Sequence, residues 1–235
     1  MKALKIIGTG AMALCLLISS GCSSMTQTGK GALIGGGGGA AVGAGLGAII
    51  GGGKGAGIGS AIGAAVGAGA GALIGKKMDK QKAELQQELA EKAQVETVQD
   101  QNGLQAIKVT FSSGILFPTN GTTLSTQAKS DLSSFASSLI NNPGTDVQIY
   151  GYTDDTGSLA VNTRVADGRA DAVKNYLLHS GVAANRLAAE GVPMADYVAS
   201  NATPEGRAQN RRVEVYITAS KDMIQQAENG SLSAN

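Results

Sequence analysis

Glycine recurs at every fourth position through a long stretch in the first third of the chain. The twelve glycines are Gly31, Gly35, Gly39, Gly43, Gly47, Gly51, Gly55, Gly59, Gly63, Gly67, Gly71 and Gly75. Shifting the stretch by 24 residues aligns GALIGGGGGAAVGAGLGAIIGGGK with GAGIGSAIGAAVGAGAGALIGKKM, and 15 of the 24 positions are identical. The stretch is therefore a duplicated unit. In a helix this spacing puts the glycines in one stripe, where a second helix backbone can approach closely.

Lysines divide the repeat into two stretches. Lys30, Lys54 and the Lys76-Lys77 pair bracket runs of 23 and 21 residues, each long enough at about 1.5 Å per residue to cross a hydrocarbon core of about 30 Å. We therefore predict a glycine-zipper helical hairpin over residues 31–77, and the segment resembles the glycine-zipper two-helix domains of bacterial envelope lipoproteins. Three interpretations stay open: a hairpin in or on a membrane, a module for self-association or for binding a partner, and a flexible Gly/Ala spacer.

The N-terminus has the layout of a secretory signal, with two lysines before a short apolar run that ends in small residues. The sequence ISSGC resembles a bacterial lipobox, which implies a lipoprotein signal peptide over residues 1–21 and lipidation of Cys22. Residues 22–30 would then form a lipidated tether. Ser23 is not the aspartate that resembles an inner-membrane retention signal, so we expect the outer membrane, on the side that faces the periplasm.

After the repeat the composition changes to strong helix formers. Leu85 and Leu89, four residues apart, favour a polar helical stalk to about residue 98 within a linker that covers residues 78–103. The Asn102-Gly103 turn signal marks the next domain boundary. Residues 221–235 carry no periodic pattern, and we expect a disordered tail there.

Residues 104–220 alternate between strand and helix signals. Ile107, Val109 and Phe111 alternate with polar residues, as in a half-buried strand, and Ser125 can cap a helix. The expected strands cover residues 104–111, 147–149, 187–191 and 213–217, and the expected helices cover residues 125–140 and 158–179. Together they predict an α/β sandwich, with one mixed sheet and helices on a single face.

Two opposite charges stand near the middle of this domain. Asp154 follows a predicted strand, and Arg169 lies in the helix that comes next. A loop residue and a helix residue in this arrangement can converge on one pocket. The residues alone leave a second interpretation equally open, in which the aspartate caps the helix and the arginine bonds the loop.

A family resemblance favours the pocket. The segments GYTDDTG, GRADAVKNYL and GRAQNRRVEVYI, with Asn162 between the first two, make residues 110–218 similar to the OmpA-like peptidoglycan-binding domain. That family holds the peptide stem of peptidoglycan through meso-diaminopimelate. The resemblance implies that Asp154 takes the ammonium group and Arg169 the carboxylate. It also implies a pocket lined by four further residues, Asn120, Thr156, Asn162 and Arg211. The chain departs from the family pattern at Pro118, Tyr152 and Asp155.

Charge and chemistry exclude other classes of function. Without residues 1–21 the chain has 17 basic and 18 acidic residues, which gives no basic field for nucleic acid. Cys22 would be its single cysteine, and His179, the one histidine, falls at a predicted helix end, so we expect no enzyme activity, no metal site and no cofactor. We predict an outer-membrane lipoprotein that tethers the membrane to the cell wall without covalent linkage. In the rival hypothesis the glycine repeat forms an oligomeric assembly or pore, and the C-terminal domain only anchors it.

Overall fold

The computed structural model describes residues 66–100, 102–118 and 121–233. Its elements are α4 (Ala68–Glu88), β1 (Gln94–Gln99), β2 (Gln105–Ser112), α5 (Ser113–Leu116), α6 (Thr126–Asn141), β3 (Thr145–Tyr152), α7 (Leu159–His179), η2 (Ala184–Arg186), β4 (Leu187–Val192), α8 (Pro204–Asn210), β5 (Arg212–Ala219) and α9 (Lys221–Glu228). The predicted signal peptide, Cys22, Asn120 and most of the glycine hairpin lie outside the described residues.

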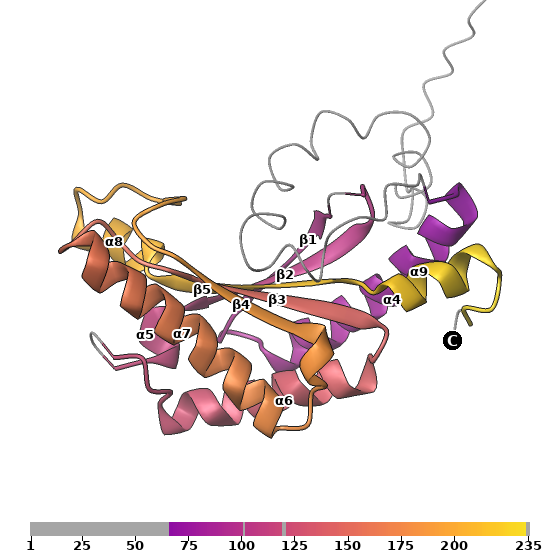
Figure 1. Ribbon diagram of the computed structural model, residues 1–235, viewed down its shortest axis with the longest axis horizontal. Helices are drawn as coiled ribbons and strands as arrows, with labels where there is room; N and C mark the ends of the chain where they lie inside the picture. The colour runs from indigo at the N-terminus through magenta and orange to yellow at the C-terminus, as the bar shows by residue number, and fades with distance from the viewer. Residues whose placement is uncertain (1–65, 101, 119–120, 234–235) are drawn as a thin grey trace, which may run out of the picture.

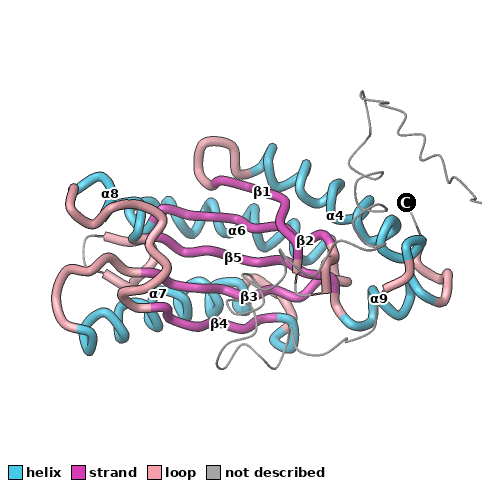
Figure 2. Tube along the Cα trace, turned by 90° about the horizontal axis from the view of Figure 1, so that it is seen from above, coloured by secondary structure: helices cyan, strands magenta, loops and turns pink. Residues whose placement is uncertain are grey.

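The five strands form one mixed sheet in the order β1-β2-β5-β3-β4. Only the β3–β4 pair among these is parallel. The register places Ile107 opposite Ile217 and Val109 opposite Val215, so the alternating apolar side chains gather on one face. Helices α6 and α7 cover that face (Figures 1 and 2). The predicted mixed sheet with helices on one face is confirmed.

Caps and apolar spacing explain why α6 and α7 form where they do. The Ser125 hydroxyl accepts a hydrogen bond from the Ala128 backbone N–H at 3.0 Å, and Ser158 caps α7 in the same way through Val161. Both helices then bury an apolar stripe on the sheet. The stripe consists of Leu132, Phe135 and Leu139 from α6 and Ala170, Val173 and Leu177 from α7.

Close packing of α7 on β3 depends on a glycine. A Cβ at Gly151 would clash with the backbone carbonyl oxygen of Ala166, and it would lie 3.3 Å from the backbone nitrogen of Ala170. Since both atoms belong to the backbone of α7, no side-chain rotation could relieve the contact. Glycine in the strand therefore sets how closely α7, and with it Arg169, approaches the sheet.

The helix that follows the glycine repeat differs from the predicted stalk. Helix α4 begins at Ala68, inside the range assigned to the hairpin, and ends at Glu88 rather than near residue 98. Residues 94–99 form the edge strand β1. The helix is no solvated spacer, because Ile74, Met78 and Leu85 are fully buried and α4 contacts α6, β1, β2 and α9. Most of the stretch predicted as a linker is thus part of the domain, since Met78, Leu85 and Leu89 are fully buried in its core.

The C-terminal segment is also more ordered than predicted. Ser220 caps α9 by accepting from the Met223 backbone N–H at 3.2 Å. The apolar side of α9 then packs against α4, which buries Met223, Ile224 and Ala227. The prediction of a disordered tail from residue 221 is therefore corrected for α9, whose short apolar face finds a partner about 150 residues earlier in the chain.

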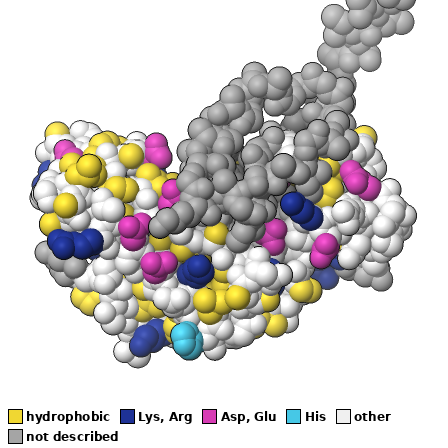
Figure 3. All heavy atoms as spheres, viewed as in Figure 1, with side chains coloured by type: hydrophobic (Ala, Val, Ile, Leu, Met, Phe, Trp, Pro, Cys, Tyr) yellow, Lys and Arg dark blue, Asp and Glu magenta, His cyan; other side chains and the backbone are white. Residues whose placement is uncertain are grey.

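Among the residues described here, no helix combines the length and the apolar character that a membrane crossing requires. Acidic and basic side chains are interspersed over the described part of the face in Figure 3, and neither sign gathers into a field. This distribution agrees with the nearly balanced charge of the sequence.

Candidate functional site

Asp154 lies in the loop between β3 and α7. One carboxylate oxygen, Oδ1, accepts the backbone N–H of Thr156 at 2.9 Å, which closes a tight turn of the kind that aspartate favours. Gly157 follows with a φ of 92°, a conformation that suits glycine, and the chain then enters α7 at its cap. The loop leaves the Asp154 side chain largely buried, at 9% relative exposure.

The second carboxylate oxygen of Asp154 pairs with an arginine from far along the chain. Arg211, directly after α8, places Nη1 2.5 Å from Asp154 Oδ2. Burial by itself raises the pKa of Asp154, but hydrogen bonds from Thr156 and Arg211 and the positive charge of Arg211 outweigh it and hold the pKa below its usual value. The site therefore keeps a negative charge at neutral pH.

Arg169 reaches the same region from α7. It is only 4% exposed, its Nε donates to the carbonyl oxygen of Gly121 at 3.1 Å, and its guanidinium carbon lies 5.4 Å from the centre of the Phe117 ring. Within the described residues its terminal groups, Nη1 and Nη2, make no hydrogen bond. Burial and the charge of Arg211 lower the pKa of Arg169, whereas the charge of Asp154 raises it. An arginine nevertheless stays protonated in a protein.

The two charges that the sequence singled out do not pair with each other. No ion pair joins Asp154 to Arg169 in the described structure, where Asp154 is bonded to Arg211 instead. The site therefore holds one anion and two cations, with the donor fork of Arg169 unused. Such an arrangement can bind a ligand that presents a carboxylate to the fork.

The remaining predicted site residues fall into three groups. The structure brings Thr156 and Arg211 into direct contact with Asp154. Asn162 is near them, but its Nδ2 donates to the carbonyl oxygens of Thr156 and Ser158 at 2.9 and 3.2 Å, so this amide holds the loop in place. Asn120 lies outside the described residues. The binding role of all these residues stays a prediction.

Some residues that shape the site were not predicted from the sequence. Phe117 and the Gly121 carbonyl position Arg169, and the fully buried Asn210 fixes the loop before α8 through hydrogen bonds to the backbone N–H groups of Val198 and Ala199. No local pattern could have identified them, because each contact joins segments that are distant in sequence.

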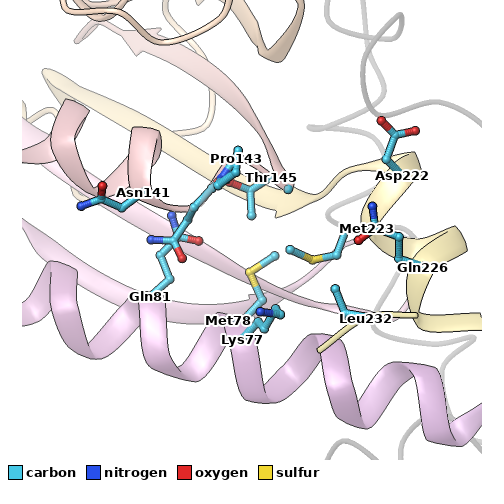
Figure 4. A pocket seen from close by; sticks show the side chains of 12 residues that line it. Lys77, Met78, Gln81, Asn141, Pro143, Thr145, Asp222, Met223, Gln226 and Leu232 are labelled. Carbon is cyan, nitrogen blue, oxygen red and sulfur yellow. The ribbon is translucent and has the colours of Figure 1, made fainter. Parts of the chain in front are cut away.

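A separate cavity lies at the other end of β3. It has a volume of about 350 Å³ and lies between α4, α9 and the loop from α6 to β3 (Figure 4). Met78 and Met223 line it together with Gln81, whose Nε2 is buried without a partner in the described structure. Because Thr145 lines this cavity and Asp154 follows the opposite end of the strand, the cavity is not part of the charged site.

Comparison with known proteins names the domain. The OmpA family matches residues 116–211, the span that contains Asp154, Arg169 and Arg211. These residues are an OmpA family domain. A second family, the YMGG-like Gly-zipper, matches residues 1–79 and confirms the glycine-zipper character of the N-terminal repeat. The OmpA family is non-enzymatic, in agreement with the expectation of a binding protein.

The curated relatives of the OmpA domain are envelope proteins by name. The chain is 38% identical over 112 residues to the probable lipoprotein YiaD of Escherichia coli, a match that covers 48% of this chain and 51% of YiaD. It is 40% identical over 112 residues to the peptidoglycan-binding protein ArfA of Mycobacterium tuberculosis, covering 48% of this chain and 34% of ArfA. The match thus spans about half the length of YiaD and a third of ArfA.

Solved structures agree on the fold. A putative MotB-like protein from Desulfovibrio vulgaris superposes with a TM-score of 0.54 at 25% identity, over 63% of this chain and 94% of that one. The cell wall anchor of the T6SS from Pseudomonas aeruginosa gives a TM-score of 0.51 at 28% identity, over 58% of this chain and 97% of that one. Both similarities extend beyond the 116–211 match of the OmpA domain.

Proposed function

We propose that the OmpA domain binds peptidoglycan through the meso-diaminopimelate of its peptide stem, and that the chain thereby tethers the outer membrane to the cell wall. The observation that carries the proposal is the buried Arg169, whose terminal N–H groups make no hydrogen bond among the described residues. The free end of diaminopimelate carries a carboxylate, which an arginine fork can hold with two parallel hydrogen bonds.

The ammonium group of the ligand has an acceptor in the same site. Asp154 stays ionised, because Thr156 and Arg211 hold its pKa below the usual value despite burial. A carboxylate with one edge toward Arg211 and one toward the loop can still accept from an ammonium group, since it has about four lone-pair sites. Arg169 and Asp154 would therefore bind the carboxylate and the ammonium group at the free end of the same diaminopimelate. The name of ArfA, a peptidoglycan-binding protein, supports the ligand class.

Co-sedimentation of the purified chain with isolated cell-wall sacculi tests the proposal. Arg169→Ala and Asp154→Ala are expected to abolish sedimentation, and Arg169→Lys is expected to restore little, because an ammonium cannot replace the planar fork. Arg164→Ala and Asp171→Ala are matched controls, since both side chains are exposed on α7. Undiminished sedimentation of both site variants, with their circular dichroism spectra unchanged, would refute the assigned site.

The membrane end of the tether is a separate proposal. The lipobox-like sequence supports lipidation of Cys22 after removal of residues 1–21, with the outer membrane as the destination. Cys22→Ser is expected to move the chain from the membrane fraction to the soluble fraction and to abolish incorporation of labelled palmitate. Unchanged labelling of the Cys22→Ser chain would contradict this assignment.

A further inference from the structure

Exposed apolar side chains are concentrated around the charged site. Among the described residues, five large apolar side chains are exposed. Four of them belong to the two segments that adjoin the site: Leu159 and Val161 at the start of α7, directly after the Asp154 loop, and Tyr197 and Val198 in the loop that connects β4 to α8. The fifth, Ile140, lies near the end of α6. A gathering of exposed apolar groups beside a binding site is typical of an extended ligand surface.

The loop that carries Tyr197 is tied to the immediate neighbours of the charged site. The hydroxyl of Thr153, which precedes Asp154, accepts the backbone N–H of Met194 at 3.0 Å. Asn210, which precedes Arg211, accepts the backbone N–H of Val198 at 2.8 Å. These two hydrogen bonds hold the backbone on both sides of Tyr197 next to the residues that precede Asp154 and Arg211.

A buried network of side chains around Arg212 also holds this loop. Nη2 of Arg212 donates to the Asp196 carbonyl oxygen at 3.0 Å, and the Arg212 guanidinium lies 3.8 Å from the centre of the Tyr152 ring. Glu214 holds this arginine through an ion pair at 2.7 Å. The loop contains two non-glycine residues with positive φ, Met194 at 51° and Asp196 at 50°. Such backbone conformations persist only where surrounding contacts enforce them, and they cluster at functional sites.

Tyr197 itself is 41% exposed. Slight desolvation together with the negative charges of Asp155 and Asp154 raises the pKa of its phenol. The phenol is therefore protonated and able to donate. Asp155 is exposed and makes no hydrogen bond or ion pair in the described structure, so its carboxylate is free to accept from a ligand.

An aromatic face beside a free carboxylate suits a sugar ring. One face of a pyranose presents C–H groups that can pack on an aromatic ring, and its edge presents hydroxyls that donate strongly to a carboxylate. We propose that Tyr197 and Asp155 form a subsite for a sugar ring of the peptidoglycan glycan strand, adjacent to the diaminopimelate site. This inference rests on the proposed function. The subsite would let the domain bind the glycan strand as well as the peptide stem.

The test uses two ligands that differ only in the sugars. The full chain in detergent is titrated by calorimetry with a diaminopimelate-containing tripeptide and with the same tripeptide linked to its disaccharide. The wild type is expected to bind the disaccharide form about tenfold more tightly. Tyr197→Ala should abolish this preference and leave tripeptide affinity unchanged, Tyr197→Phe should keep most of it, and Asp155→Asn should reduce it. Ile140→Ala is the matched control, because it removes an exposed apolar side chain away from the site.

Each other outcome has a distinct meaning. Equal binding of the two ligands by the wild type would overturn the sugar subsite and leave the diaminopimelate site intact. An equal loss of affinity for both ligands in Tyr197→Ala would assign the tyrosine to the peptide stem and would also overturn the subsite. If the wild type bound neither ligand, the proposed function itself would fail, and the subsite with it.

Discussion

Leu85→Ala in α4 tests whether the segment after the glycine repeat belongs to the folded domain. Leu85 is fully buried, on a helix that contacts α6, β1, β2 and α9. Truncation of a buried leucine removes its transfer free energy and leaves a cavity, at a cost of about 2–5 kcal/mol. With a urea m-value of about 2 kcal/mol/M, the unfolding midpoint should fall by roughly 1–2.5 M.

The assay is urea unfolding of a fragment that begins at residue 66, followed by far-ultraviolet circular dichroism. Gln87→Ala provides the control, because Gln87 is exposed on the same helix. This substitution should change the free energy of unfolding by no more than about 0.5 kcal/mol. If Leu85→Ala changed the midpoint as little as Gln87→Ala, α4 would be a detached stalk and the reasoning from burial would be refuted.

Two further predictions concern the core and a buried acid. Gly151→Ala should destabilise the domain by about 1–3 kcal/mol or more, because the added Cβ meets the backbone of α7. Gly69→Ala is the control and should stabilise α4 slightly, because nothing lies within 4 Å of a Cβ at that position. Equal urea midpoints for the two variants would contradict the packing argument. Burial raises the pKa of Asp146 to about 6, and the charge of Arg186 opposes the rise. In the unfolded chain the pKa of an aspartate is about 3.9, so the folded state binds the proton more tightly. The free energy of unfolding therefore falls as the pH rises from about 4 to 6. In urea unfolding, Asp146→Asn should therefore become more stable relative to the wild type between pH 4 and pH 7. A difference in unfolding free energy that stays constant over this range would contradict the raised pKa of Asp146.

Local signals sufficed for most of the domain, but not for its two ends. The cap at Ser125 and the alternation in β2, β3 and β5 are properties of neighbouring residues, so the sequence predicts these elements well. Strand β1 forms because it pairs with β2, although its own residues are mostly polar. Helix α9 is similarly short and polar, and it depends on α4 for a partner. Tertiary contacts of this kind override weak local propensity.

The same distinction applies to the charged site. The family resemblance identified Asp154, Arg169 and Arg211, and the structure brings the three together. The resemblance did not predict that Asp154 would pair with Arg211, 57 residues away, and leave the fork of Arg169 unused. It also gave no indication of Tyr197, because the position of the loop that carries it depends on hydrogen bonds to Thr153 and Asn210.

The most direct test of the diaminopimelate site changes the ligand by one charged group. Two stem tripeptides are titrated into the wild-type chain, one with diaminopimelate and one with lysine in its place, which keeps the ammonium but lacks the terminal carboxylate. A charged hydrogen-bonded pair contributes about 1.5–3 kcal/mol, so the wild type should prefer the diaminopimelate peptide by roughly 10- to 150-fold. Arg169→Ala should abolish that preference. Equal affinity of the wild type for both peptides, or a preference that survives in Arg169→Ala, would contradict the proposed recognition of diaminopimelate.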